Sequence, residues 1–201
     1  PVARFDVLGI QRGAVEAIGT PAIRSLNFHI DETHLQGSAP AYGEVDADYT
    51  PRRFYLDRIL VDAAIAAGVE AREQFSVKEL LFEDGRVVGI RGAGKGGETV
   101  TEKASVVIGA DGVRSMVADA VNAPTTVDAG IHTCGHYAYY SGMRDRDDAA
   151  SLYILTEQRR FYITFPTNDD LDMVFLFWPT EMARMVRADV DRAFTESLKH
   201  V

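Results

Sequence analysis

The residues best suited to bind a ligand follow a short apolar segment in the middle of the chain. Residues 106–110 read Val-Val-Ile-Gly-Ala, as expected for a strand covered on both faces in a parallel sheet. Asp111 and Gly112 come directly after it, and ligands of open α/β sheets bind beyond the carboxyl ends of strands. Gly112 permits a tight turn there, and Asp111 can accept hydrogen bonds. An ordinary turn, with Asp111 or Ser115 capping a following helix, explains the pattern equally well.

Residues 92–97 form a second candidate, because Gly-Ala-Gly-Lys-Gly-Gly satisfies the G-x-G-x-x-G spacing of dinucleotide sites. In those sites the glycines follow a buried strand and open a helix, whose N–H groups hold the pyrophosphate. Here residues 98–102 alternate like a strand and have no helical stripe. We therefore predict a glycine-rich hairpin turn rather than a dinucleotide site. No Gly-Lys-Ser/Thr follows, so a P-loop is not indicated either.

Histidine, cysteine and acidic residues offer weaker candidates. His132, Cys134 and His136 are zinc-type ligands on one face of a predicted strand, but no fourth ligand is adjacent. We therefore expect no metal there and packed or pocket-lining side chains instead. The acidic pairs at residues 147–148 and 169–170 fall in predicted turns, where we expect solvated loop residues. A serine hydrolase has no support, since the chain lacks a G-x-S-x-G segment.

The elements that position these residues are predicted from periodicity. Residues 23–30 alternate and predict a half-buried strand, and the polar residues 31–50 predict a loop. A helix is predicted at residues 56–67, where apolar side chains recur at steps of three, four and seven. Residues 75–103 predict a β-meander that turns at residues 83–85, Glu-Asp-Gly.

The C-terminal part predicts an aromatic antiparallel sheet followed by one helix from about Glu181. The predicted strands are residues 132–141, 151–155, 160–166 and 172–178. Ile163, Phe165 and Phe175 share one face of the central hairpin, with Thr167 at its end, and form our candidate lining of a substrate pocket. The alternative is core packing against the last helix, which is slightly favoured for any single residue.

Composition narrows the classes of partner. The chain has 201 residues and a net charge of −9, so nucleic acids and anionic membranes are not expected partners. No apolar run approaches the roughly 20 residues of a membrane helix. The single cysteine, Cys134, excludes an internal disulfide and, with no signal peptide evident, favours a cytoplasmic location. Both ends of the chain are typical of cuts through a longer protein.

Several segments together resemble one enzyme family. Residues 109–115, Gly-Ala-Asp-Gly-Val-Arg-Ser, are similar to the Asp-Gly motif of the aromatic-hydroxylase (group A) flavoprotein monooxygenases. Residues 51–60 resemble that family's Arg-x-x-Leu-Asp-x-x-Leu helix start, and Gln11-Arg12-Gly13 resembles an earlier Arg-Gly turn. The resemblance implies that Arg12, Arg53, Asp111 and Gly112 contact FAD. Arginine suits this role because it binds phosphate through two parallel hydrogen bonds.

The resemblance also implies a fold and an activity. The fold class is α/β, with a partial Rossmann-like FAD-binding domain (residues 1–21 and 50–130) interleaved with an antiparallel substrate domain (residues 22–49 and 131–201). NAD(P)H would reduce FAD, and a small organic substrate would be hydroxylated with O₂. A flavin-dependent prenyl-chain reductase and a non-catalytic binding module remain alternatives.

The chain departs from the family at three points. No strand–G-x-G-x-x-G–helix unit precedes Arg12, no Gly-Asp dipeptide occurs, and Ala118 stands where an arginine is usual. These departures predict that the chain holds only part of a flavin site.

Overall fold

The chain divides into two compact units. The computed structural model describes residues 10, 13–38, 40–41, 43, 45–143 and 148–199. One unit comprises residues 1–69 and 130–201, and the other comprises residues 70–129. Within the described residues, no helix is long and apolar enough to cross a membrane.

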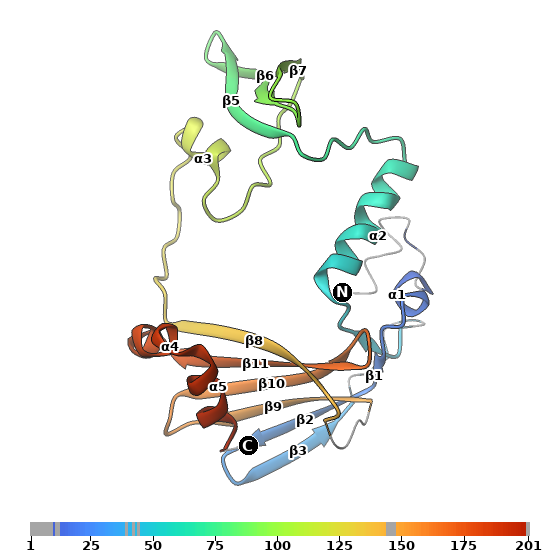
Figure 1. Cartoon of the computed structure of the whole chain (residues 1–201), viewed down its shortest axis with the longest axis vertical. Helices are drawn as coiled ribbons and strands as arrows, with labels where there is room; N and C mark the ends of the chain where they lie inside the picture. Colours follow the sequence, from blue (N-terminus) through green and yellow to red (C-terminus); the bar gives the residue numbers. More distant parts are fainter. Residues whose placement is uncertain are drawn as a thin grey trace. The chain divides into compact units, whose positions relative to one another are not determined.

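A six-stranded sheet dominates the first unit, in the order β3-β2-β9-β10-β11-β8 (Figure 1). Its strands are β2 (Ser25–Ile30), β3 (Thr33–Gly37), β8 (Thr133–Ser141), β9 (Ala149–Leu155), β10 (Arg160–Thr167) and β11 (Leu171–Pro179). Strands β2 and β9 pair in parallel, and every other neighbouring pair is antiparallel. The predicted strands at residues 23–30, 132–141, 151–155, 160–166 and 172–178 are therefore confirmed, with ends shifted by a few residues.

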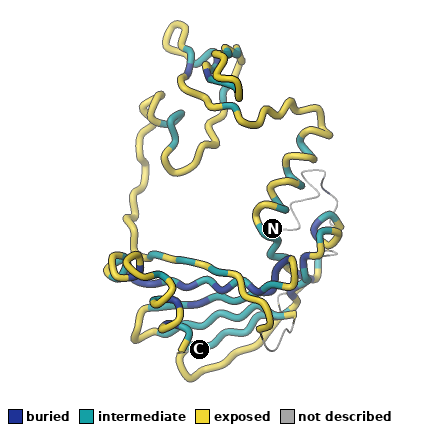
Figure 2. The backbone as a smooth tube through the Cα atoms, in the orientation of Figure 1, coloured by how far each residue is buried: buried dark blue, intermediate teal, exposed yellow. Residues whose placement is uncertain are grey.

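One face of this sheet carries the core. Its buried members are Tyr162, Val174, Leu176 and Trp178 from the sheet, with Val186 and Phe194 from the helices that cover it. Figure 2 shows that the buried residues of the sheet lie mainly on β10 and β11, where they alternate with half-buried ones. Because side chains alternate along a strand, the residues between these core positions must point to the other face.

The opposite face of the sheet, here called the open face, is apolar and only partly buried within this unit. Pairing registers place Phe28, Leu152, Ile163, Phe175 and Tyr137 in one row across five strands. Phe161, Phe175 and Phe177 stack on this face with ring centroids 4.0 Å apart in each neighbouring pair. All are only half-buried, apart from Tyr137, which is exposed. Such a surface is unusual for a solvated face and is typical of a binding site.

Three short helical segments cover the core face, where the sequence predicted one helix. They are η3 (Thr180–Met182), α4 (Ala183–Ala188) and α5 (Val190–Leu198). The prediction of a single helix is wrong because Asp189 leaves helical geometry (φ −155°) and caps α5, accepting a hydrogen bond from the Arg192 N–H at 3.0 Å. Aspartate is among the best N-cap residues.

The region between β2 and α2 was predicted as a loop and contains more structure. Strand β3 pairs with β2, and β4 (Asp48–Tyr49) pairs with β1 (Ala22–Ile23). The loop prediction is wrong for residues 33–37, where a tight turn at Asp31 (φ 47°) folds the chain back onto β2. A short helix, α1 (Gly13–Ala17), precedes these strands.

Helix α2 (Arg53–Ala66) confirms the helix predicted at residues 56–67 and begins three residues earlier. The predicted apolar stripe, which includes Leu56 and Leu60, is the less exposed side of the helix. None of the α2 residues is fully buried.

The second unit is built around a β-meander, as predicted. Strands β5 (Ser76–Glu83), β6 (Arg86–Ala93) and β7 (Thr99–Lys103) are antiparallel in chain order. Asp84 and Gly85 both have positive φ at the first turn, as two-residue hairpins require. Residues 94–97 form the second turn, closed by a 3.0 Å bond from the Gly97 N–H to the Gly94 carbonyl. The hairpin prediction for this glycine-rich segment is therefore confirmed.

The buried strand predicted at residues 106–110 does not form. This segment is assigned to no strand, and Val106 and Ile108 are 73% and 84% exposed. An apolar run indicates a preference for burial, but a strand needs neighbours to pair with. No such neighbour occurs among the described residues.

Candidate functional site

A cavity of about 490 Å³ opens at one end of the open sheet face. Its lining comes from β8, β10, β11, β4 and the start of α2, and comprises Tyr49, Thr50, Pro51, Arg52, Arg53, Leu56, Tyr137, Tyr139, Phe165, Thr167, Met173 and Phe175. Its volume lies within the range of small-molecule sites, about 300–1,000 Å³. Aromatic and apolar side chains on the sheet face polar groups from the helix start, which is the arrangement expected for an organic ligand.

The loop between β10 and β11 fixes one wall of this cavity through Asn168. This side chain is fully buried. Its Nδ2 donates to the Ile18 carbonyl at 2.8 Å and to Thr20 Oγ1 at 2.9 Å, and its Oδ1 accepts from the Arg52 N–H at 2.9 Å. One amide thereby joins the hairpin, the segment after α1 and the start of α2.

Two threonines make a reciprocal pair beside it. Thr50 Oγ1 donates to the Pro166 carbonyl at 2.6 Å, and Thr167 Oγ1 donates to the Thr50 carbonyl at 2.7 Å. Thr167 is almost fully buried, so its hydroxyl is committed to the backbone. Thr167 therefore stabilises the wall of the cavity as well as lining it.

The adjacent arginines at the helix start have different surroundings. Arg52 pairs with Asp169 and lies over the Tyr139 ring, with its guanidinium carbon 4.9 Å from the ring centroid. Arg53 is 82% exposed and pairs along the helix with Asp57 at 3.0 Å, which raises the pKa of Arg53. Arg52 is thus held in the wall, and Arg53 is the guanidinium at the rim that solvent or a ligand can reach.

Asp169 is exposed and lies in the turn between β10 and β11, which confirms its prediction as a solvated loop residue. Besides pairing with Arg52, it accepts a hydrogen bond from the Tyr55 hydroxyl at 3.0 Å. This bond is the main reason that the pKa of Tyr55 is raised. The sequence did not predict these contacts of the hairpin tip with Arg52 and Tyr55.

The structure brings together four of the residues chosen from sequence: Arg53, Phe165, Thr167 and Phe175 all line the cavity. Ile163 lies on the same sheet face, opposite Phe175 and Leu152, but outside the cavity lining. The alternative for these side chains, packing against the last helix, is wrong because α4 and α5 cover the other face.

Sequence reasoning missed the tyrosines and methionine of the same wall. Tyr137 lies opposite Phe175, and Tyr139 lies opposite Met173. Tyr137 and Tyr139 are two positions apart on a predicted strand, so the sequence does indicate that they share one face. Only the order of the strands in the sheet shows that this face lies beside the hairpin.

Asp111 and Gly112 lie in the second unit and form a helix cap. Asp111 Oδ1 accepts from Ser115 Oγ at 2.5 Å, and Oδ2 accepts from the Val117 N–H at 3.2 Å. Ser115 Oγ accepts from the Ala118 N–H at the start of α3 (Met116–Ala120). The Ser115 hydroxyl is the largest cause of the lowered pKa of Asp111. Gly112 has φ +85° and open space around its Cα, so close approach of another group remains possible at this turn.

Arg12 and the group of His132, Cys134 and His136 are the two remaining candidates. Arg12 lies outside the described residues. No group of three metal-type ligands occurs within residues 13–38, 45–143 and 148–199. Cys134 and His136 instead face the core side of the sheet, where the His136 ring meets Trp178 edge-on.

Comparison with known proteins identifies the family. The FAD binding domain family matches residues 17–199. The chain belongs to this family of FAD-binding flavoproteins, that of the group A monooxygenases. The resemblance noted from the Asp-Gly and arginine segments is thereby confirmed.

Individual relatives agree with this membership. The chain is 35% identical over 161 residues to the digeranylgeranylglycerophospholipid reductase of Methanothrix thermoacetophila, covering 76% of this chain and 41% of that protein. It is 28% identical over 173 residues to monooxygenase cfoF of Aspergillus candidus, covering 81% and 40% respectively.

Solved structures share the fold. The myxobacterial chondrochloren halogenase CndH matches with a TM-score of 0.81 at 20% identity, over 98% of this chain and 46% of that one. PqsL of P. aeruginosa, in complex with 2-aminobenzoylacetate, matches with a TM-score of 0.72 at 15% identity, over 94% and 50%. The predicted α/β class is therefore confirmed. The chain spans about half the length, or less, of the proteins it matches.

Proposed function

We propose that this chain is the substrate-binding portion of an FAD-dependent monooxygenase that hydroxylates a small, flat organic substrate, using NAD(P)H and O₂. The observation that carries the proposal is the aromatic cavity of the open sheet face. There Phe165, Phe175 and Tyr137 offer ring surfaces, and Arg53 lies at the rim. A cytoplasmic location, where NAD(P)H is supplied, is part of the proposal.

Each of the two units holds residues whose chemistry suits FAD. Arg53 has an exposed guanidinium whose partner is another exposed side chain on the same helix, so an incoming phosphate can compete for it. Gly112 leaves room for a close approach, and the Asp111 carboxylate is held ionised beside it. When bound, the flavin supplies the redox chemistry. We assign Arg12, Arg53, Asp111 and Gly112 to its binding, and Ile163, Phe165, Thr167 and Phe175 to substrate.

The sheet residues then have the task of orienting the substrate. A planar ring on Phe175 and Tyr137 gains offset-stacked or edge-to-face contacts, each worth roughly 0.5–1.5 kcal/mol beyond area burial. The hydrogen bonds of Asn168 and Thr167 hold this wall rigid. A rigid wall favours one orientation of the bound ring, and hence one site of oxidation.

A prenyl-chain reductase is the second candidate, favoured by the 35% identity to the Methanothrix thermoacetophila reductase. The apolar row of the open face continues from the cavity through Ile163 and Leu152 to Phe28. A row of this kind suits an extended isoprenoid chain. The two functions therefore predict different ligand lengths on the same face.

Reconstitution of the purified chain with FAD, followed by oxygen uptake with NADH or NADPH, tests the first proposal. We expect weak but measurable retention of flavin absorption, because the chain holds only part of a flavin site, together with uptake that depends on an aromatic acid such as 2-aminobenzoate and a product heavier by one oxygen atom. Oxygen-independent gain of two hydrogens by a prenyl substrate would establish the reductase instead. A colourless chain that still binds the acid would favour a binding module.

A variant pair isolates the cavity itself. Phe175→Ala removes a lining ring, and Phe161→Ala removes a ring of the same face that lies outside the cavity. We expect the first to weaken 2-aminobenzoate binding about tenfold and the second to leave it within about twofold. Equal effects would show that the cavity is not the ring-binding site.

A further inference from the structure

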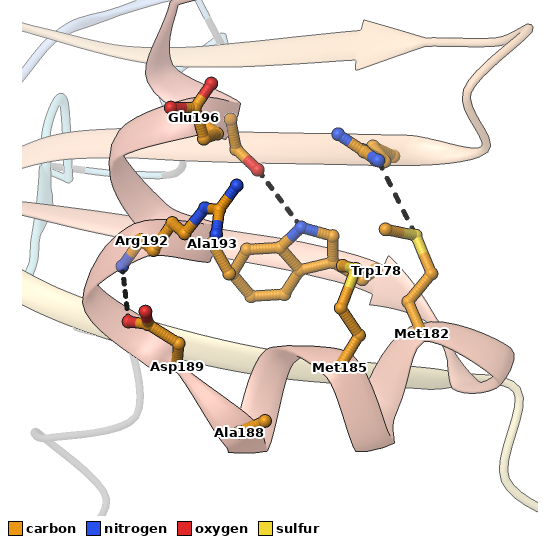
Figure 3. A pocket seen from close by; sticks show the side chains of 10 residues that line it. Trp178, Met182, Met185, Ala188, Asp189, Arg192, Ala193 and Glu196 are labelled. Carbon is orange, nitrogen blue, oxygen red and sulfur yellow. Dashed lines mark hydrogen bonds between the residues drawn. The ribbon is translucent and has the colours of Figure 1, made fainter.

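A second cavity lies on the core side of the sheet, between the strands and the C-terminal helices. It encloses about 460 Å³ and is lined by Arg160, Trp178, Met182, Met185, Ala188, Asp189, Arg192, Ala193, Glu196 and Ser197. Figure 3 shows the Trp178 ring among these side chains. Trp178 and Phe175 have opposite parity on β11, so this cavity and the aromatic cavity lie on opposite faces of the sheet.

Arg160 gives the cavity an unsatisfied cationic group. Its Nε is buried and has no hydrogen-bond partner. Its Nη2 contacts the Met182 Sδ at 3.6 Å, and thioether sulfur is a weak acceptor. Leaving a buried charged donor unpaired costs more free energy than leaving a neutral donor unpaired. Arg160 as a whole is only partly buried, so an anionic acceptor from outside the chain can approach this side chain.

The carboxylates of the lining already have donors of their own. Asp189 accepts from the Arg192 N–H at 3.0 Å, and Glu196 pairs with Lys199 at 2.8 Å. Arg192 adds a second guanidinium to the lining. The lining therefore carries two guanidinium groups and two carboxylates, and each carboxylate already accepts from a donor within the chain.

The remaining walls are apolar and leave room for a hydrocarbon or aryl body. The indole of Trp178 lies at the buried floor of the cavity with 1% exposure, and its Nε1 is satisfied by Ser197 Oγ at 3.1 Å. Met182 and Met185 have flexible side chains that adapt to varied shapes. Ala188 and Ala193 are small, which keeps the space between the helices and the sheet open.

We propose that this cavity binds an organic carboxylate with an apolar body, with the carboxylate on Arg160 and the body against Trp178, Met182 and Met185. The site is separate from the aromatic cavity and does not depend on the proposed function. A medium-chain fatty acid has the required chemistry, since its volume fits the cavity and its head accepts hydrogen bonds from a guanidinium.

Trp178 is the only tryptophan of the chain, so its fluorescence reports directly on this cavity. We would titrate the full chain with decanoate and, separately, with decanol, which has a similar apolar body and no charge. We expect saturable change with decanoate and at least about tenfold weaker binding of decanol, because a charge-assisted hydrogen bond contributes roughly 1.5–3 kcal/mol.

Three variants separate the site from general hydrophobic binding. Arg160→Met should weaken decanoate at least about tenfold while the melting temperature is kept or raised, because the orphan donor is removed. Ala188→Leu, at an exposed position of the lining, should block entry. Arg159→Met is the matched control, since Arg159 is exposed and pairs with Glu181. Equal affinity for the acid and the alcohol, unchanged affinity in Arg160→Met, or equal losses in both arginine variants would overturn the proposal.

Discussion

Replacement of Asn168 by alanine should destabilise the sheet unit more than any other single polar truncation in its loops. The change removes three hydrogen bonds of 2.8–2.9 Å, made by a side chain with 0% exposure. Each bond contributes about 1 kcal/mol net, and more when its partner stays buried and unpaired. The expected loss is therefore about 3 kcal/mol of unfolding free energy.

Urea unfolding followed by far-UV circular dichroism measures this loss. With a slope of about 2 kcal/mol per molar urea, the midpoint should fall by about 1.5 M. Asn27→Ala is the matched control, because Asn27 makes one long bond to Ser151 at 3.4 Å and its Oδ1 has no partner. Equal midpoints for the two variants would refute the view that Asn168 joins three segments.

Asn168→Asp tests the same hydrogen bonds through the pH dependence of stability. The new oxygen would face the Ile18 carbonyl, which accepts a bond in the native chain, so only the protonated acid fits. Burial and this oxygen raise the pKa of the new carboxyl in the folded state. The folded state then binds more protons than the unfolded one, and stability should fall as pH rises above about 3.9. A pH-independent difference from the parent chain would contradict this account.

Three further perturbations probe other parts of the fold. Tyr162→Phe should leave thermal stability unchanged or raise it by up to about 1 kcal/mol, because the buried hydroxyl has no partner. Gly89→Ala should cost about 2 kcal/mol in the second unit, since a Cβ there would lie 2.1 Å from the Glu102 carbonyl oxygen; an unchanged melt would refute the close approach. Burial and, secondarily, His34 lower the pKa of His29, so stability should fall as pH drops below about 6.5. This dependence should weaken in His34→Gln, and equal profiles would count against the ring stack between the histidines.

Local chemistry explains what the sequence predicted correctly. The hairpin at residues 83–85 combines alternation with two turn residues that tolerate positive φ, so neighbours along the chain suffice to specify it. The same holds for Phe165 and Phe175, whose shared face follows from parity and one turn. Their assignment to a cavity also relied on their aromatic side chains, which are typical of small-molecule sites.

Long-range pairing explains most of what was missed. Asn168 looked like a loop residue, yet its partners lie about 116–150 positions earlier in the chain. Residues 106–110 have the composition of a buried strand but no pairing partner among the described residues. Composition alone therefore gave a wrong strand prediction for this segment. The break at Asp189 is the exception, because an aspartate three residues before a helical N–H is a local cap signal that a long apolar stripe obscured.

The parallel pairing of β2 with β9 has a consequence for biosynthesis. Asn27 meets Ser151 across 124 positions of chain, so the hairpin of β2 and β3 leaves the ribosome long before its neighbour in the sheet exists. A lone two-stranded hairpin is at best marginally stable in water. The nascent polypeptide must keep Phe28 and Leu35 soluble while a whole second unit is translated, and closure of so distant a contact is slow. Chaperone demand during translation should therefore be concentrated on this early hairpin.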